Sequence, residues 1–159
     1  MLDGAPNELS LYASEGTWLK KKGKSLRRYT LRLDGFVSAH ASAKGGELLT
    51  KPVVFSGHRL SLNFATSAAG SIRVAIEHPN GTPIDGFSIA DCSPHFGNTL
   101  DREVTWNSQQ DLGQLAGKPI RLRFVLQDAD LFSFRFHKMN DADRAATKLD
   151  RKHETIPAR

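Results

Sequence analysis

Residues 59–92, RLSLNFATSAAGSIRVAIEHPNGTPIDGFSIADC, decide the fold of this 159-residue chain. Apolar residues alternate with small or polar ones in two runs: Leu60, Leu62 and Phe64, then Ile72, Val74 and Ile76. A period of two places one set of side chains on a buried face of a β-strand. The small residues 66–71 predict a hairpin connection between the two strands, and Asn80-Gly81 predicts a type I′ turn into a third strand.

Short alternating runs outside this stretch predict further strands, over residues 8–14, 28–33, 36–41, 47–55 with a break at Pro52, 102–106, 120–126 and 132–136. Residues 128–130 predict a turn. Residues 111–117 predict a single helical turn that Asp111 caps and Gly117 ends. Because no long run has a helical period, we expect an all-β fold, an antiparallel two-sheet β-sandwich of jelly-roll type.

Three regions follow from these patterns. Residues 1–34 form a lead-in hairpin with a long charged loop, and it looks like the last piece of an earlier module. Residues 35–137 form the β-sandwich domain, which is long enough to bury a core without a disulfide or metal. Residues 138–159 are charged and poor in large apolar side chains, which is typical of a frayed helix or a disordered tail.

The formal charge of +5 is spread along the chain, and its densest run, residues 20–24, predicts a solvated hairpin tip rather than a nucleic-acid surface. No apolar run is long enough to cross a membrane. The single cysteine, Cys92, excludes an internal disulfide, and zinc-ligand spacing is absent. The N-terminus lacks a signal-peptide pattern, but this chain could be the end of a longer one, so no compartment is predicted.

Four aspartates in or beside the predicted turns are candidate oxygen ligands for calcium: Asp85, Asp91, Asp128 and Asp130. The alternative for Asp128 and Asp130 is that their carboxylates accept hydrogen bonds from turn amides. Glycoside hydrolysis needs two carboxylates about 5–9 Å apart across a sugar, and the sequence shows no cleft that would hold one.

A serine hydrolase site is the other catalytic arrangement to consider. Ser88, Ser93, Asp91 and His95 are close in the sequence, but no G-x-S-x-G elbow occurs. The six histidines show no metal-ligand spacing. We therefore assign no catalytic residue, and calcium is the one cofactor considered.

Arginines oppose the apolar rows of several strands, at Arg73, Arg121, Arg123 and Arg135. Three interpretations are open, and we rank them in the order given. The arginines form cross-strand pairs with acidic residues such as Glu77 and Glu103, or their face packs on another domain. In the third, they bind sugar hydroxyls beside aromatic residues on which a sugar ring would stack, drawn from Tyr12, Trp18, Tyr29 and Trp106.

Several segments together carry a family resemblance: LRRYTLRLDGFVSAHA, GGELLTKPVVFSG, GSIRVAIEHPNGTPIDGFSIADC and DLGQLAGKPIRLRFVLQDADLFSFRF. Over about residues 8–137 the chain resembles the C-terminal β-sandwich of bacterial proteins related to invertase and fructosidase-type glycoside hydrolases. The resemblance implies a five-bladed propeller before the sandwich, with residues 8–33 as the end of its last blade. The propeller motifs that hold the catalytic carboxylates are absent from this chain, so no catalytic residue carries over.

Three functions are therefore considered. The first is a non-catalytic accessory β-sandwich that supports a glycosidase-like catalytic domain or assists its contact with carbohydrate. The second is a stand-alone carbohydrate-binding module. The third is a glycosidase in its own right, using Asp91, Asp128 and Asp130. A sandwich without its propeller could also form a homodimer through the surface that the propeller would cover.

Overall fold

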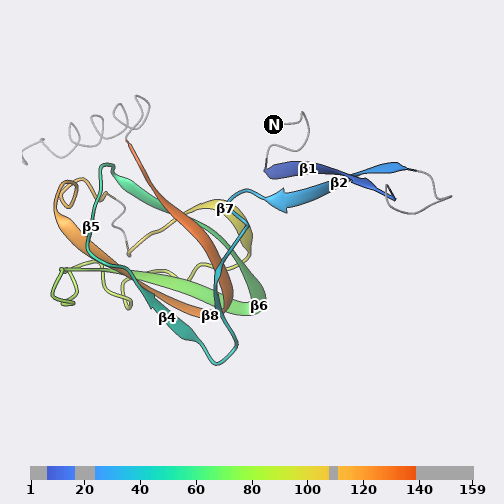
Figure 1. The fold of residues 1–159 in the computed structure, drawn as a ribbon. Coiled ribbons are helices and arrows are strands. Elements are labelled where there is room, and N and C mark those ends of the chain that lie inside the picture. The colour runs from blue at the N-terminus through green and yellow to red at the C-terminus, as the bar shows by residue number, and fades with distance from the viewer. Residues whose placement is uncertain (1–6, 17–23, 108–110, 139–159) are drawn as a thin grey trace, which may run out of the picture.

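A computed structural model of the chain describes residues 7–16, 24–107 and 111–138. Every regular element in these ranges is a β-strand: β1 (Glu8–Glu15), β2 (Ser25–Arg32), β3 (Ala39–Ala41), β4 (Gly46–Leu49), β5 (Val53–Val54), β6 (Arg59–Glu77), β7 (Asn98–Glu103) and β8 (Pro119–His137). They form a two-stranded sheet and a six-stranded sheet in which all the strand pairs are antiparallel (Figure 1). The prediction of an all-β antiparallel fold is confirmed.

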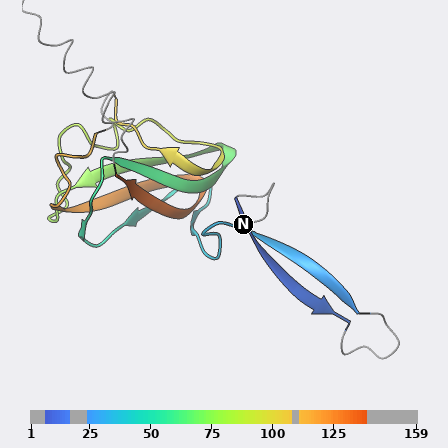
Figure 2. The same cartoon turned by 90° about the horizontal axis from the view of Figure 1, so that it is seen from above.

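The six-stranded sheet is built on the pairing of β6 with β8. The pairing runs from Arg59 opposite His137 to Glu77 opposite Arg121. The other edge of β8 pairs in turn with β3, β4 and β5, while β7 pairs with β6. The resulting sheet is strongly curled, as Figures 1 and 2 show. We call this unit the body.

Two predicted turns are wrong, because β6 and β8 each continue through them. Residues 66–71 do not form a hairpin between two strands, and residues 128–130 do not end a strand. Instead, the pairing shifts register between Thr66 and Ser71 of β6, opposite Asp128 of β8. Asp128 has a φ of 43°. A Cβ added at Gly70 would lie 2.3 Å from the Asp128 carbonyl oxygen. Only glycine therefore fits at this point, where the β6 backbone lies against the backbone of its neighbour β8.

The core contains both predicted apolar rows of β6. Leu60, Leu62, Phe64, Ile72, Val74 and Ile76 are all fully buried. They belong to one cluster with side chains of β8, with Trp106 and with Leu112. The indole Nε1 of Trp106 donates a buried hydrogen bond of 2.7 Å to the Val74 carbonyl oxygen. The two apolar rows, which were predicted to lie on two strands, therefore lie on one continuous strand and contribute to a single core.

Local turns differ in detail from the sequence predictions. At Asn80-Gly81 the turn is present, but only Gly81 has a positive φ, of 92°. The Gly81 amide donates to the His78 carbonyl, and the His78 amide donates to the Thr82 carbonyl. This is a three-residue loop with glycine in the left-handed position, so the type I′ assignment is wrong.

Residues 111–117 form successive turns rather than a helix. The carboxylate of Asp111 nevertheless accepts a hydrogen bond from the Gly113 amide, at 2.7 Å, as a capping residue would. Leu112 is fully buried, so these turns close one side of the core.

The strands β1 and β2 form a separate hairpin that pairs with no other strand of the described chain. Figure 2 shows this hairpin projecting away from the body. Predictions for residues 1–6, for the basic run at 20–23, for Trp18 and for the tail at 139–159 lie outside the described residues. Within the described ranges, no helix has the length and apolarity to span a membrane.

Candidate functional site

Three of the four predicted arginines share one face of the body. Arg123 is opposite Ala75, Arg121 is opposite Glu77 and Arg73 is opposite Val125, so all three lie on the side of the β6–β8 pair away from the core rows. Arg135 is opposite Ser61, beyond the register shifts, and is exposed. The structure thus gathers three of the candidates and separates the fourth.

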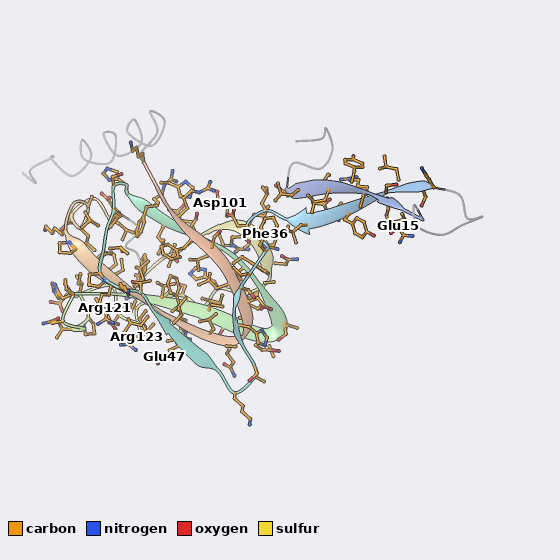
Figure 3. The ribbon with its side chains drawn as sticks, viewed as in Figure 1. Glu15, Phe36, Glu47, Asp101, Arg121 and Arg123 are labelled. Atoms are coloured by element: carbon orange, nitrogen blue, oxygen red, sulfur yellow. The ribbon has the colours of Figure 1, made fainter. Side chains whose placement is uncertain are left out.

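Arg123 forms cross-strand ion pairs with acidic residues, as the first-ranked interpretation predicted. Its guanidinium contacts Glu77 and Glu47, each at 2.5 Å, and Figure 3 shows Glu47 beside Arg123 and Arg121. Hydrogen bonds from Arg123 to Glu77 and then to Glu47 raise the pKa of the arginine. The Nε of Arg121 donates to the Thr50 carbonyl oxygen at 3.2 Å. These donors are therefore engaged within the body.

The aromatic residues proposed for a sugar platform do not join these arginines. Trp106 is completely buried, and Tyr12 and Tyr29 lie on the projecting hairpin. Trp18 is outside the described residues. None of the three described aromatic side chains, Tyr12, Tyr29 and Trp106, is therefore in position to stack a sugar ring beside Arg121 and Arg123.

Each of the four aspartates has its own surroundings. Asp85 is exposed. The carboxylate of Asp130 accepts a hydrogen bond from the Ser38 hydroxyl at 2.8 Å and lies 3.0 Å from His40 Nδ1. The backbone amide of Asp128 donates to the Ser42 carbonyl. Within the described ranges, no group of three or more His, Cys, Asp or Glu side chains could hold a metal ion.

Asp91 stabilises a local turn. One carboxylate oxygen accepts from the Ser88 hydroxyl and amide, at 2.7 and 3.1 Å, and the other accepts from Asn107 at 2.9 Å. The hydrogen bonds from Ser88 lower the pKa of Asp91. His95 is buried elsewhere, with its Nε2 4.0 Å from Cys92 Sγ. Ser88 and Asp91 therefore contact each other, whereas the His95 side chain contacts Cys92, and the three do not form a Ser-His-Asp relay.

A second cluster of serine, histidine and aspartate, which was not predicted from the sequence, lies between β6, β7 and β8. Ser61 Oγ and Asp101 Oδ1 both contact His137 Nε2, at 2.6 and 3.2 Å. This cluster lines a pocket of about 110 Å³ with Arg59 and Glu103. In a catalytic triad the serine and the aspartate use opposite nitrogens of the histidine. Because both groups here contact the same nitrogen, this cluster does not have the geometry of a catalytic triad.

The hairpin β1–β2 was predicted from the sequence as a lead-in hairpin, but not as a candidate binding surface. On one of its faces Leu9 is opposite Leu31 and Leu11 is opposite Tyr29. Leu11 is 55% exposed and Tyr29 46% exposed. On the other face, exposed apolar side chains are Tyr12 and Leu26. The rest of this second face is polar or charged. We call this ribbon, with exposed apolar side chains on both faces, the docking hairpin.

A two-stranded ribbon is marginally stable in water when nothing packs on it. The charged side chains of the docking hairpin pair along the ribbon itself: Glu15 contacts Arg27 at 2.9 Å and Glu8 contacts Arg28 at 3.5 Å. These exposed pairs stabilise the hairpin only weakly. Among the described residues, no strand other than β1 and β2 pairs with the edges of this hairpin. Alternating residues at 8–14 and 28–33 were a usable signal, because both faces carry apolar side chains.

Searches of protein-family models, curated proteins and solved structures found no match to this chain.

Proposed function

We propose that this chain is a non-catalytic accessory β domain of a glycoside-hydrolase-like protein, and that its docking hairpin attaches it to a catalytic partner domain. The single observation that carries the proposal is the projecting ribbon with apolar side chains on both faces. The resemblance to the sandwich of fructosidase-type hydrolases supports it, since it implies that residues 8–33 complete the last propeller blade, whose other strands would pair with the ribbon. The curled sheet would then be the jelly-roll-like sandwich of that architecture.

The size of the docking hairpin favours a β-rich partner domain over a second copy of this chain. Two strands of eight residues span about 26 Å by about 10 Å, so each face offers roughly 250 Å². Two copies in contact through one face would bury about 500 Å² in total, which is below the ~1,000 Å² expected of a specific interface. A partner domain that covers both faces would bury about 1,000 Å² in total, and pairing of one of its strands with an edge of the ribbon would add to this area. Edge pairing of this kind is a common mode of β-strand recognition.

The experiment measures binding of this chain to an isolated five-bladed propeller domain of a fructosidase-type hydrolase from the same genome, by biolayer interferometry. We expect saturable binding that is lost in the double variant Leu9→Ser, Leu11→Ser. The matched control is Val54→Ser, because Val54 is 66% exposed on the body and not on the hairpin. A glycan array and a glycosidase assay of the purified chain complete the test.

Each outcome bears on the proposal. Propeller binding that depends on Leu9 and Leu11, with no glycan binding and no turnover, supports it. Absence of propeller binding, or binding that the double variant retains, overturns it. Saturable glycan binding unaffected by the hairpin substitutions replaces it with a carbohydrate-binding module. Turnover that Asp91→Asn abolishes replaces it with an enzyme.

A further inference from the structure

The docking hairpin is attached to the body by more than the peptide chain, through the last residue of β2. The guanidinium of Arg32 donates from Nε to Asn63 Oδ1 at 2.6 Å and from Nη2 to the Phe64 carbonyl at 3.0 Å. It also donates to the Asn98 side chain and to the Thr99 carbonyl. Asn63 and Phe64 belong to β6, and the other two acceptors belong to β7. One side chain of the hairpin therefore engages two neighbouring strands of the body.

Two further contacts hold the same junction. The Arg32 guanidinium carbon lies 4.7 Å from the centre of the Phe132 ring. Phe132 is the extra residue of β8 at a register shift: Asn63 is opposite Ser133 and the next residue of β6, Phe64, is opposite Leu131, so Phe132 has no partner in β6. Arginine stacks favourably on an aromatic face, so the bulge in β8 supplies a platform for the guanidinium. The Asn63 amide also donates to the Leu33 carbonyl, at 2.8 Å, one residue beyond the hairpin.

The chemistry of the junction requires arginine. Its four acceptors are two side-chain amide oxygens and two carbonyl oxygens, which surround a planar group with donors in fixed directions. Lysine has the charge but not the planar fork of donors. Because these acceptors carry no charge, the junction does not depend on an acidic group that titrates. Burial lowers the pKa of Arg32, but arginine remains protonated in proteins.

We propose that Arg32 is a positioning residue, a clamp that fixes the direction in which the docking hairpin leaves the body. Arg28 offers the contrast, because its contacts, with Ser10 and Glu8, lie within the hairpin. The clamp is a property of this chain alone and does not depend on the proposed function. Its consequence does rest on that function: a domain bound to the hairpin would be held in one orientation relative to the body.

The experiment measures the distance between the hairpin and the body by double electron–electron resonance. Spin labels are placed on the exposed positions Ser25 of β2 and Ala68 of β6, each changed to cysteine. Cys92 is buried, so a chain with Cys92 alone measures background labelling. The distance is recorded with Arg32 present, in Arg32→Lys and Arg32→Ala, and in the control Arg28→Gln.

We expect one narrow distance with Arg32 present and in Arg28→Gln, and loss of that narrow peak in both Arg32 variants. Tryptophan fluorescence in a Trp18→Phe background checks that the body is folded, because Trp106 is then the only tryptophan and is buried in the folded body. A broad distribution in the parent chain overturns the inference, and so does a narrow one in Arg32→Ala with the body folded. If the Arg32 variants do not fold, the parent chain and Arg28→Gln still test whether the hairpin has a fixed direction. The measurement involves no partner, so its failure is distinct from failure of propeller binding.

Discussion

The contrast between two leucines tests whether the docking hairpin belongs to the cooperative core. Leu62 is completely buried in β6, whereas Leu11 is 55% exposed in β1. Replacement of a buried leucine by alanine costs about 2–5 kcal/mol of unfolding free energy. Full burial of leucine is worth about 1.5–3 kcal/mol, so the covered part of Leu11, a little under half of it, contributes about 1 kcal/mol. We therefore expect Leu62→Ala to destabilise the body severely and Leu11→Ala to leave it nearly unchanged.

The assay is urea unfolding followed by tryptophan fluorescence in a Trp18→Phe background, so that Trp106 alone reports on the body. Leu62→Ala should lower the unfolding free energy by about 2 kcal/mol or more, or prevent folding altogether. Leu11→Ala should shift it by less than about 1 kcal/mol, with an unchanged dependence on urea. A loss of about 2 kcal/mol or more in Leu11→Ala would show that the hairpin is an integral part of the core, which would refute this reasoning.

Three other predictions concern the body. Trp106→Phe should cost about 2–4 kcal/mol in urea unfolding, because it leaves a cavity and removes the buried hydrogen bond to the Val74 carbonyl. Gly70→Ala should lower the thermal midpoint by several degrees, since a Cβ there meets the Asp128 carbonyl oxygen. Burial lowers the pKa of His95, so the folded state takes up a proton less readily than the unfolded state. Stability should therefore be full above about pH 6.5 and decline below it, in a midpoint-versus-pH series, and His95→Gln should weaken that decline.

Gly81→Asn is the control for Gly70, because nothing lies within 4 Å of a Cβ at Gly81 and asparagine tolerates a positive φ. Equal effects of the two substitutions would contradict the steric argument. A full-strength decline in His95→Gln would assign the pH dependence to other groups. Fully native stability of Trp106→Phe would show that the Val74 carbonyl finds another donor.

The core rows were predictable from the sequence because burial follows alternation. Leu60, Leu62 and Phe64 point inward with Ile72 and Val74, as expected. The connection between them was not predictable in the same way. Small residues at 66–71 suit a hairpin turn, and they equally suit a register shift within one long strand that lies close to its neighbour. Only the close approach of Gly70 to β8 distinguishes the register shift from the hairpin. Local composition carries no information about that distant strand.

The candidate sites depended even more on distant contacts. Arg123 finds Glu47 and Glu77 because three strands bring them together, and the sequence suggested only one of these two partners. Arg32 has no local feature that distinguishes it from Arg28, yet its four acceptors lie on β6 and β7. The apolar faces of the docking hairpin were visible in the sequence. Their exposure became evident only from the absence of a covering strand among the described residues.

The position of β8 has a consequence for biosynthesis. This strand pairs with β3, β4, β5 and β6, and it is the last strand of the described chain. A ribosome that has made residues 1–118 has therefore produced strands whose main neighbour does not yet exist. Contacts between residues that are far apart in the sequence form slowly, and apolar segments that stay exposed until these contacts form are prone to aggregate. The nascent chain must stay protected until residues 119–137 emerge, and a premature stop codon near the start of that interval would leave β6 without most of its pairing.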